Sequence, residues 1–339
     1  MLRTNDFYID LGTANTLVYA KKRGFVLNEP TVLAVRHRSE SHSELFALGR
    51  DAKVMLGKSP ENLSVMRPLR EGVVADFDNA VRMLHAFVKK AKENVFWLRP
   101  RLIISLPCQV SRFERRAVEE IGYELGASSV QLLEEPVAAA IGAGLAVLGK
   151  RGQMIVDIGG GTTEIAIIAL GGIVTSTAVR AGGDDIDEAI ITHLKTRHHF
   201  LIGEQTAERI KIEVADVNPV APQSKTIEIG GFNLLKRLPT RLLVDTNMIL
   251  PAVDSVVREI ITAIRKALEE CPPEIAGDIA ESGLVLAGGG ALLGGLRERI
   301  AQEIGIPVKI SDQPLLSVAL GGAKALEDSK LFDGLEKPA

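Results

Sequence analysis

Apolar runs of strand length alternate with helical patterns along the chain. Residues 102–107 form an apolar run typical of a buried strand, and Ser111 with Glu114 gives the Ser-x-x-Glu signature of a helix start. From Ser111 to Gly126, apolar residues recur at helical spacing, which predicts one buried face made of Phe113, Ala117, Ile121 and Leu125. A strand leading into a helix indicates an α/β layered domain.

The second half follows the same scheme. Strands are predicted at 154–157 and 164–170, and a helix at 184–195 follows the Gly182-Gly183 turn. A long amphipathic helix is predicted at 253–269, and a strand at 284–286 leads into a glycine turn. Near the N-terminus, the strand-like run 30–35 is followed by the polar stretch 37–44, which predicts a surface loop.

Two segments about 150 residues apart repeat one another. Residues 9–19 (Ile-Asp-Leu-Gly-Thr-Ala-Asn-Thr-Leu-Val-Tyr) and 156–166 (Val-Asp-Ile-Gly-Gly-Gly-Thr-Thr-Glu-Ile-Ala) each predict a strand, a glycine-containing hairpin turn and a second strand. Glycine turns let backbone N–H groups approach a phosphate closely, because no Cβ blocks the way. Two such turns, each next to an aspartate, predict a polyphosphate gripped between two halves, with a hard cation held by carboxylates and waters.

Composition narrows the function classes. A chain of 339 residues predicts two domains, and 46% apolar residues with a net charge of −3 indicate a folded protein without a basic surface for nucleic acid. Cys108 and Cys271 lie far apart and lack metal-ligand spacing, which fits a reducing compartment. The N-terminus has no secretory signal and no apolar run reaches the roughly 18 residues of a membrane span, so we expect a cytoplasmic protein with at most peripheral membrane contact.

One apolar segment suggests such a contact. Val95, Phe96, Trp97 and Leu98 include the only Trp of the chain and are bracketed by Lys89, Lys90, Lys92, Arg99 and Arg101. Aromatic residues between basic ones suit an interface with anionic lipid. From spacing alone, entry into the strand that starts near Arg101 is an equally good interpretation.

Taken together, these motifs resemble the actin-like ATPase superfamily, and within it the MreB family of bacterial actins. The resemblance runs from Ile9 to about Leu326 and rests on residues 10–16, Glu134-Glu135-Pro136 with the Ala-rich stretch 138–144, residues 157–164 and residues 207–211. It implies an α/β actin-like fold with two duplicated lobes, each a mixed sheet flanked by helices, and a nucleotide in the cleft between them. The implied subdomains are 1–32 with 76–145, 33–75, 146–180 with 246–339, and 181–245.

The resemblance also implies roles for residues. Glu135 and Thr162 match catalytic positions, although Glu134 stays an alternative to Glu135, which is preferred because it directly precedes the proline. Asp10 and Asp157 match carboxylates that position Mg²⁺ through waters. Nucleotide contacts are implied for Thr13, Ala14, Asn15, Gly159, Gly160, Gly161, Thr162, Gly182, Gly183, Asp185, Glu208, Arg209, Ile210, Lys211, Gly288, Gly289, Gly290 and Ala291.

The implied function is that of a cell-shape-determining bacterial actin, which binds ATP and ADP, hydrolyses ATP slowly and assembles with itself into paired protofilaments. The family's hydrophobic loop at 95–98 implies insertion into the inner membrane, where filaments meet membrane proteins of cell-wall elongation. A chaperone-type ATPase and a small-molecule kinase of the same superfamily are the alternatives. P-loop chemistry is not expected, because no lysine follows Gly12 closely enough. His198 and His199 are not expected to share a metal, because neighbours in a helix point apart.

Overall fold

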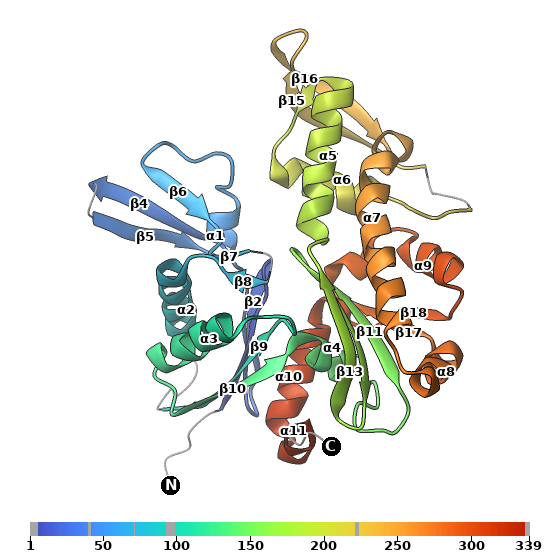
Figure 1. Ribbon diagram of the computed structural model, residues 1–339. Coiled ribbons are helices and arrows are strands. Elements are labelled where there is room, and N and C mark those ends of the chain that lie inside the picture. Colours follow the sequence, from blue (N-terminus) through green and yellow to red (C-terminus); the bar gives the residue numbers. More distant parts are fainter. Residues whose placement is uncertain (1–5, 40–41, 71, 93–98, 221–223, 336–339) are drawn as a thin grey trace. The chain divides into compact units, whose positions relative to one another are not determined.

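The computed structural model describes residues 6–39, 42–70, 72–92, 99–220 and 224–335, and the chain divides into two compact units (Figure 1). Unit 1 comprises residues 1–153, 168–174 and 315–339, and unit 2 comprises residues 154–167 and 175–314. The finer division of each unit into subdomains stays a prediction.

The elements in or mainly in unit 1 are β1 (Phe7–Leu11), β2 (Asn15–Ala20), β3 (Gly24–Pro30), β4 (Leu33–Ser39), β5 (His42–Leu48), α1 (Arg50–Lys53), β6 (Leu63–Met66), β7 (Leu69–Arg70), β8 (Val73–Val74), α2 (Phe77–Lys92), β9 (Arg101–Leu106), α3 (Arg112–Glu124), β10 (Ser129–Glu134), α4 (Glu135–Gly142), η2 (Pro314–Leu316), α10 (Ser317–Glu327) and α11 (Ser329–Leu335). Those in or mainly in unit 2 are β11 (Gln153–Ile158), β12 (Thr163–Ala169), β13 (Gly172–Val179), α5 (Gly183–His198), β14 (Phe200–Leu201), α6 (Glu204–Val214), β15 (Thr226–Asn233), β16 (Leu238–Asp245), α7 (Thr246–Glu269), α8 (Pro273–Ser282), β17 (Leu284–Ala287), η1 (Gly289–Leu292), α9 (Leu296–Ile304) and β18 (Val308–Ile310).

The two large sheets have the same strand topology. One five-stranded sheet has the order β3-β2-β1-β9-β10 and the other the order β13-β12-β11-β17-β18, so each strand of the first has a counterpart in chain order in the second. In the first sheet, the β1–β2 hairpin is antiparallel while β9 and β10 run parallel to β1, which makes the sheet mixed. The predicted duplication and the α/β class of the fold are confirmed.

Both faces of the unit 1 sheet are covered, because β1 is buried on both sides. Successive strand side chains point to opposite faces. Phe7, Ile9 and Leu11 join a core with apolar residues of α2 and α3. Tyr8 faces the other way, and a Cβ on Gly322 of α10 would lie 2.1 Å from its ring. Helices therefore flank both faces of the sheet, and Asp10 shares the side of Tyr8.

The prediction of a surface loop at 37–44 is wrong, because residues 37–39 belong to β4 and residues 42–44 to β5. β4 and β5 pair antiparallel in a three-stranded sheet ordered β5-β4-β6. Arg38 forms an ion pair with Glu44 at 2.8 Å, and His37 shares a hydrogen bond of 2.8 Å with Ser64. The segment is polar because its side chains pair across exposed strands, which is a pattern that strands on a small sheet allow.

The capping box of α3 is confirmed, but its predicted apolar face is only partly right. Ser111 Oγ accepts a hydrogen bond from the Glu114 N–H, and the Glu114 carboxylate accepts one from the Ser111 N–H at 2.6 Å. Ile121 and Leu125 are buried, whereas Phe113 is 83% exposed. The buried face of α3 consists instead of Val118, Ile121 and Leu125, and it does not include Phe113 of the first turn.

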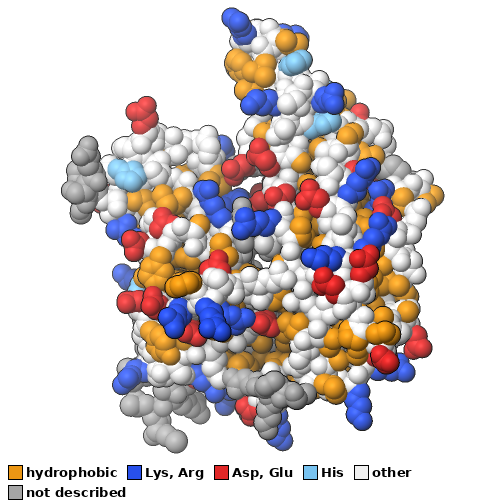
Figure 2. Space-filling model, in the orientation of Figure 1, with side chains coloured by type: hydrophobic (Ala, Val, Ile, Leu, Met, Phe, Trp, Pro, Cys, Tyr) orange, Lys and Arg blue, Asp and Glu red, His pale blue; other side chains and the backbone are white. Residues whose placement is uncertain are grey.

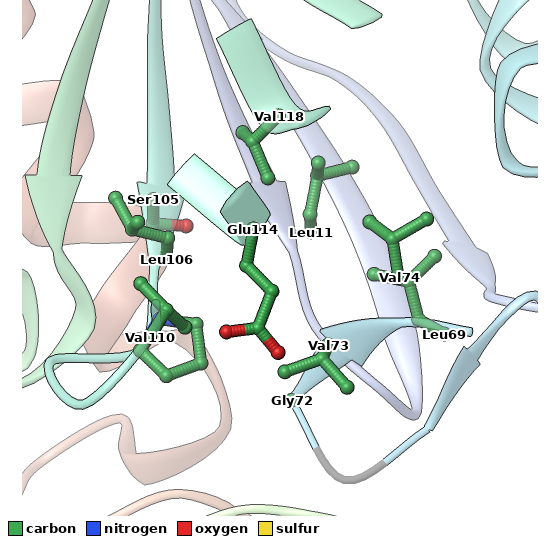
Figure 3. A pocket seen from close by; sticks show the side chains of 11 residues that line it. Leu11, Leu69, Gly72, Val73, Val74, Ser105, Leu106, Val110, Glu114 and Val118 are labelled. Carbon is green, nitrogen blue, oxygen red and sulfur yellow. The ribbon is translucent and has the colours of Figure 1, made fainter. Parts of the chain in front are cut away.

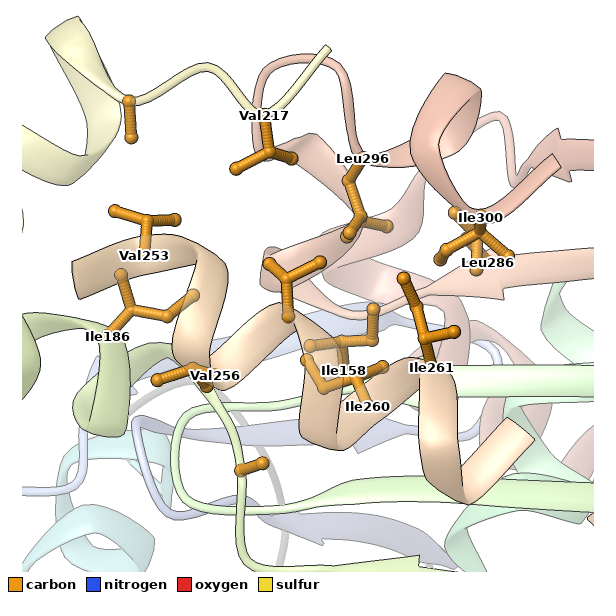
Figure 4. Close-up of a cluster of buried hydrophobic side chains, with 14 of the residues drawn as sticks. Ile158, Ile186, Val217, Val253, Val256, Ile260, Ile261, Leu286, Leu296 and Ile300 are labelled. Carbon is orange, nitrogen blue, oxygen red and sulfur yellow. The ribbon is translucent and has the colours of Figure 1, made fainter. Parts of the chain in front are cut away.

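Unit 2 has one large apolar core beneath α7 (Figure 4). Ile158 of β11 and Leu286 of β17 pack with Val253 and Ile260 of α7 and with Ile186 of α5. Asp245 caps α7 by accepting a hydrogen bond of 2.9 Å from the Met248 N–H. This core fixes the carboxyl ends of β11 and β17, which carry the glycine turns described below.

The surface mixes both signs of charge. On the face shown in Figure 2, Lys and Arg side chains are interspersed with Asp and Glu, in line with the net charge of −3. Within the described part of the chain, no helix combines the length and apolar character required to cross a bilayer.

Candidate functional site

The β1–β2 turn of unit 1 is held in place by one buried threonine. The Thr31 hydroxyl donates to the Gly12 carbonyl at 2.7 Å, and the Thr31 N–H donates to the Ala14 carbonyl at 3.0 Å. A Cβ on Gly12 would come within 2.7 Å of the Asn15 carbonyl oxygen, so this position requires glycine. Ala14 and Asn15 at the tip are exposed and can meet a ligand.

Asp10 lies in β1 just before this turn and is buried. The Ser105 hydroxyl, at the end of β9, donates to Asp10 Oδ1 at 3.2 Å. Burial raises the pKa of Asp10 to about 7, and the Ser105 hydrogen bond offsets only part of that rise. A bound cation would favour the ionised carboxylate, so Asp10 is suited to a metal site.

Thr13 connects the turn to the β7–β8 hairpin. Its side chain is buried, and its hydroxyl accepts a hydrogen bond of 3.0 Å from the Gly72 N–H. Gly72 also borders the pocket of unit 1 shown in Figure 3, into which the Glu114 side chain projects. The pocket is lined by Leu11, Leu69, Gly72, Val73, Val74, Ser105, Leu106, Pro107, Val110, Glu114 and Val118. Ser105 thus lines this pocket and also contacts Asp10.

Glu135 begins α4 at the same edge of the unit 1 sheet. β1, β9 and β10 run parallel, and Glu134 is in register with Leu106, so the ends of these strands and the start of α4 meet at the edge that carries Asp10. Glu134 forms an ion pair of 2.9 Å with Arg115 of α3. That contact ties Glu134 to α3, and the preference for Glu135 over Glu134 as the catalytic carboxylate stays a prediction.

In unit 2, the β11–β12 turn is closed by the Gly159 N–H, which donates to the Thr162 carbonyl at 2.8 Å. A second glycine turn docks onto it. The Gly183 N–H donates to the Gly159 carbonyl at 3.0 Å and the Asp184 N–H to the Gly160 carbonyl at 2.8 Å. A Cβ on Gly182 would lie 2.5 Å from the Gly160 carbonyl oxygen, so the close approach depends on glycine.

Two acidic side chains of α5 support this second turn. Asp185 accepts a hydrogen bond of 2.8 Å from the Gly182 N–H. Asp187 Oδ2 pairs with Lys211 Nζ of α6 at 2.9 Å, and the same ammonium donates to the Gly183 carbonyl at 2.7 Å. Burial raises the pKa of Asp187 to about 6 against the opposing attraction of Lys211, and Glu208 and Asp184 raise it further.

The third glycine turn follows β17, whose residue Ala287 is in register with Asp157 of β11. Gly288 has φ +76°, and a Cβ there would lie 2.2 Å from the Ile158 carbonyl oxygen and 2.6 Å from Asp157 Oδ1. Its N–H donates to the Pro314 carbonyl at 2.9 Å. The turn therefore stands directly against the buried Asp157 carboxylate.

Within unit 2 the structure thus brings together Gly159, Gly160, Gly182, Gly183, Asp185, Lys211, Asp157 and Gly288. The side chains of Ile210 and Ala291 lie in the apolar core, and Arg209 is exposed. Residues 95–98 lie outside the described residues. Among the described residues, no three His, Cys, Asp or Glu side chains cluster as a metal site, and His199 ends α5 in the left-handed conformation with φ 51°.

Sequence reasoning missed four supporting residues: Thr31, Gly72, Ser105 and Asp187. Three of them act on a turn that lies distant in sequence, so no local pattern points to them. Asp187 had a weak signal, because it lies one helical turn after Gly183 on the same helix.

Comparison with known proteins places the chain in a family. The model of the MreB/Mbl protein family matches residues 4–333. The cell shape-determining protein MreB of Escherichia coli (strain K12) is 48% identical over 333 residues, covering 98% of this chain and 96% of that protein.

Solved structures agree with this match. Crystal structures of MreB5 of Spiroplasma citri superpose with TM-scores of 0.92 for the AMPPNP-bound form, at 30% identity and 99% coverage of both chains, and 0.90 for the ADP-bound form, at 31% identity, 98% coverage of this chain and 99% of that chain. Because the family model matches residues 4–333 and a relative is 48% identical over 98% of the chain, this chain belongs to the MreB/Mbl family of bacterial actin homologues that determine cell shape.

Proposed function

We propose that this protein is a filament-forming ATPase that determines cell shape. The observation that carries the proposal is the pair of duplicated hairpins, each with a glycine turn beside a buried aspartate, in a chain whose relatives have been solved with AMPPNP and with ADP. Burying an ionised carboxylate costs free energy unless a partner such as a cation stabilises it. Glycine turns offer backbone N–H groups to phosphate.

The phosphate contacts are assigned to backbone. In unit 1, Thr13, Ala14 and Asn15 supply them, with Thr31 keeping the turn rigid. In unit 2, residues 159–162 and 182–183 supply them, and Asp185 holds the second turn. Glu208 and Lys211 of α6 are assigned to the ribose and base, and residues 288–291 to the adenine side.

The chemistry is hydrolysis. Glu135 at the start of α4 orients the attacking water and accepts its proton, while Thr162 holds that water or the γ-phosphate. Positioning and charge stabilisation by preorganised backbone dipoles do most of the work, as is usual for phosphoryl transfer.

Asp10 and Asp157 fit a Mg²⁺ ion. Both are buried carboxylates beside a glycine turn, and Gly288 leaves the space at Asp157 that a side chain would fill. Mg²⁺ keeps several waters and takes only one or two carboxylates, so a single aspartate beside each turn is a sufficient protein ligand. When bound, the ion neutralises charge on the phosphates.

Assembly and location extend the proposal. The protein forms homopolymers of paired protofilaments on the inner face of the cytoplasmic membrane, where residues 95–98 insert into lipid and membrane proteins of cell-wall elongation attach. A polymer strengthens weak individual membrane contacts through multivalency.

A labelling experiment separates hydrolysis from the kinase alternative. Purified protein is incubated with Mg²⁺ and ATP labelled at the γ-phosphate, with and without a panel of sugars and small acids. We expect the label in inorganic phosphate, with release rising as the protein polymerises. Label transferred to a panel member would contradict the proposal, and so would label that stays in ATP under polymerising conditions.

A further inference from the structure

Two of the glycine turns of unit 2, the β11–β12 turn and the Gly182-Gly183 turn, are held together through Gly183. Its N–H donates to the Gly159 carbonyl of the first turn, and its own carbonyl accepts from Lys211 Nζ. Gly183 is therefore gripped from both sides, by the backbone of the β11–β12 turn and by a side chain of α6. A shift of Lys211 would release one of these two contacts.

Lys211 is placed by a buried counter-charge. Its side chain is only 16% exposed, and that of its partner Asp187 is 12% exposed. A buried ammonium needs such a partner. An ammonium has three N–H donors, and Asp187 and Gly183 already take two of them, so at most one is left for a ligand.

We infer that Asp187 is a positioning residue for nucleotide binding: it holds Lys211 on the Gly183 carbonyl and so keeps the Gly182-Gly183 turn docked on the β11–β12 phosphate turn. The inference rests on the proposed nucleotide site. It gives Lys211 a second role beside its proposed contact with the nucleotide: two of its donors shape the phosphate turns, and the third is left for the ligand.

The energetics support this role. Burial raises the pKa of Asp187 to about 6, so the ionised carboxylate is held at the expense of folding stability. Replacing a buried ion pair by apolar groups is often neutral or stabilising. The contribution that the structure shows directly is geometric: the pair fixes the Gly183 carbonyl between two phosphate turns.

The test compares D187N with D254N. Asp254 is a matched control because it forms a similarly sheltered ion pair with Arg299, 3.1 Å long, between α7 and α9 of the same unit. Three quantities are measured on the full-length protein: ATP affinity by titration calorimetry, amide hydrogen exchange at residues 182–186, and kcat at saturating ATP. D187N is expected to weaken ATP binding about ten-fold and to speed exchange of the Gly183 and Asp184 amides, with kcat at saturating ATP changed less than about two-fold. D254N is expected to change none of the three.

A neutral pair guards against misfolding. The double variant D187N/K211M removes both charges of the pair, and it should bind ATP no more weakly than K211M alone, because Asp187 acts through Lys211. Provided that the wild type binds ATP, the inference is overturned if D187N has the same ATP affinity and the same amide exchange as the wild type. If the wild type itself binds no ATP, the proposed function fails, whereas the exchange result still tests the link between the two turns.

Discussion

Gly321 of α10 lies so close to Ala138 of α4 that a Cβ on Gly321 would come within 1.7 Å of the Ala138 carbonyl oxygen. The contact is reciprocal, since a Cβ on Gly142 would lie 1.8 Å from the Ser317 carbonyl oxygen. Lys324 Nζ also donates to the Ile141 carbonyl at 3.0 Å. The backbone of α10 therefore sets the position of α4, which begins with Glu135.

Gly321→Ala should consequently force the two helices apart. We expect a loss of about 2 kcal/mol or more in the free energy of unfolding, measured by urea denaturation, because overpacked backbone contacts cannot relax. ATP hydrolysis should also fall, because Glu135 moves with α4. Gly277→Ala is the control: nothing lies within 4 Å of its added Cβ in α8, so it should be neutral or stabilise by about 0.5–1 kcal/mol. Equal effects of the two substitutions would refute the packing argument.

The adjacent glutamates should differ sharply. Glu135→Gln should lower kcat for ATP hydrolysis by about 10²–10⁴-fold while ATP still binds, because the amide cannot accept a proton from water. Glu134→Gln removes only the partly exposed ion pair with Arg115, so its kcat should stay within a few-fold of the wild type. Phosphate release under single-turnover conditions measures both. A larger defect in Glu134→Gln would reverse the assignment.

Asp187 predicts a pH dependence of stability. Its pKa of about 6 in the folded protein exceeds the ordinary value of 3.8, so the folded state holds this proton more tightly than the unfolded chain. The resulting stabilisation is complete below about pH 4 and is lost as the pH rises through 6. The free energy of unfolding of the wild type, minus that of D187N, should fall by about 1–3 kcal/mol between pH 4 and pH 7. Denaturant titrations across this range measure it, and a flat or rising difference would disprove it.

Trp97 should matter for lipid rather than for nucleotide. Trp97→Ala is expected to reduce co-sedimentation with anionic vesicles about five- to ten-fold and to leave ATP affinity unchanged. The comparison is made in ADP, so that polymer does not mask the change. Leu243→Ala, which trims an exposed apolar side chain of unit 2, serves as control and should bind vesicles like the wild type. Unaltered vesicle binding by the Trp97 variant would contradict the proposed insertion of residues 95–98 into lipid.

The sequence predicts much of the fold because its strongest signals are local. Three features depend only on residues close together in sequence, and the structure confirms all of them: the repeated hairpins at 9–19 and 156–166 and the capping box at Ser111. The polar stretch 37–44 misled because cross-strand pairs such as Arg38 with Glu44 make an exposed hairpin look like a loop. Phe113 misled because helical spacing alone does not say which stripe of a helix is buried.

The residues that support the site could not be predicted in the same way. Thr31 reaches Gly12 across the β2–β3 hairpin, Ser105 reaches Asp10 from the neighbouring strand β9, and Asp187 meets Lys211 from another helix. Each contact depends on how distant elements pack. Only the packed structure places these hydroxyl and carboxylate groups on the turns they support.

The proposed function joins ATP binding and hydrolysis to the assembly of filaments. The most direct test is electron microscopy of the purified protein on anionic vesicles with Mg²⁺ and ATP, ADP or no nucleotide, with phosphate release followed in the same samples. The account predicts membrane-bound filaments with ATP, and phosphate released as they form. Bound ATP without any polymer, across a range of protein and salt concentrations, would contradict it.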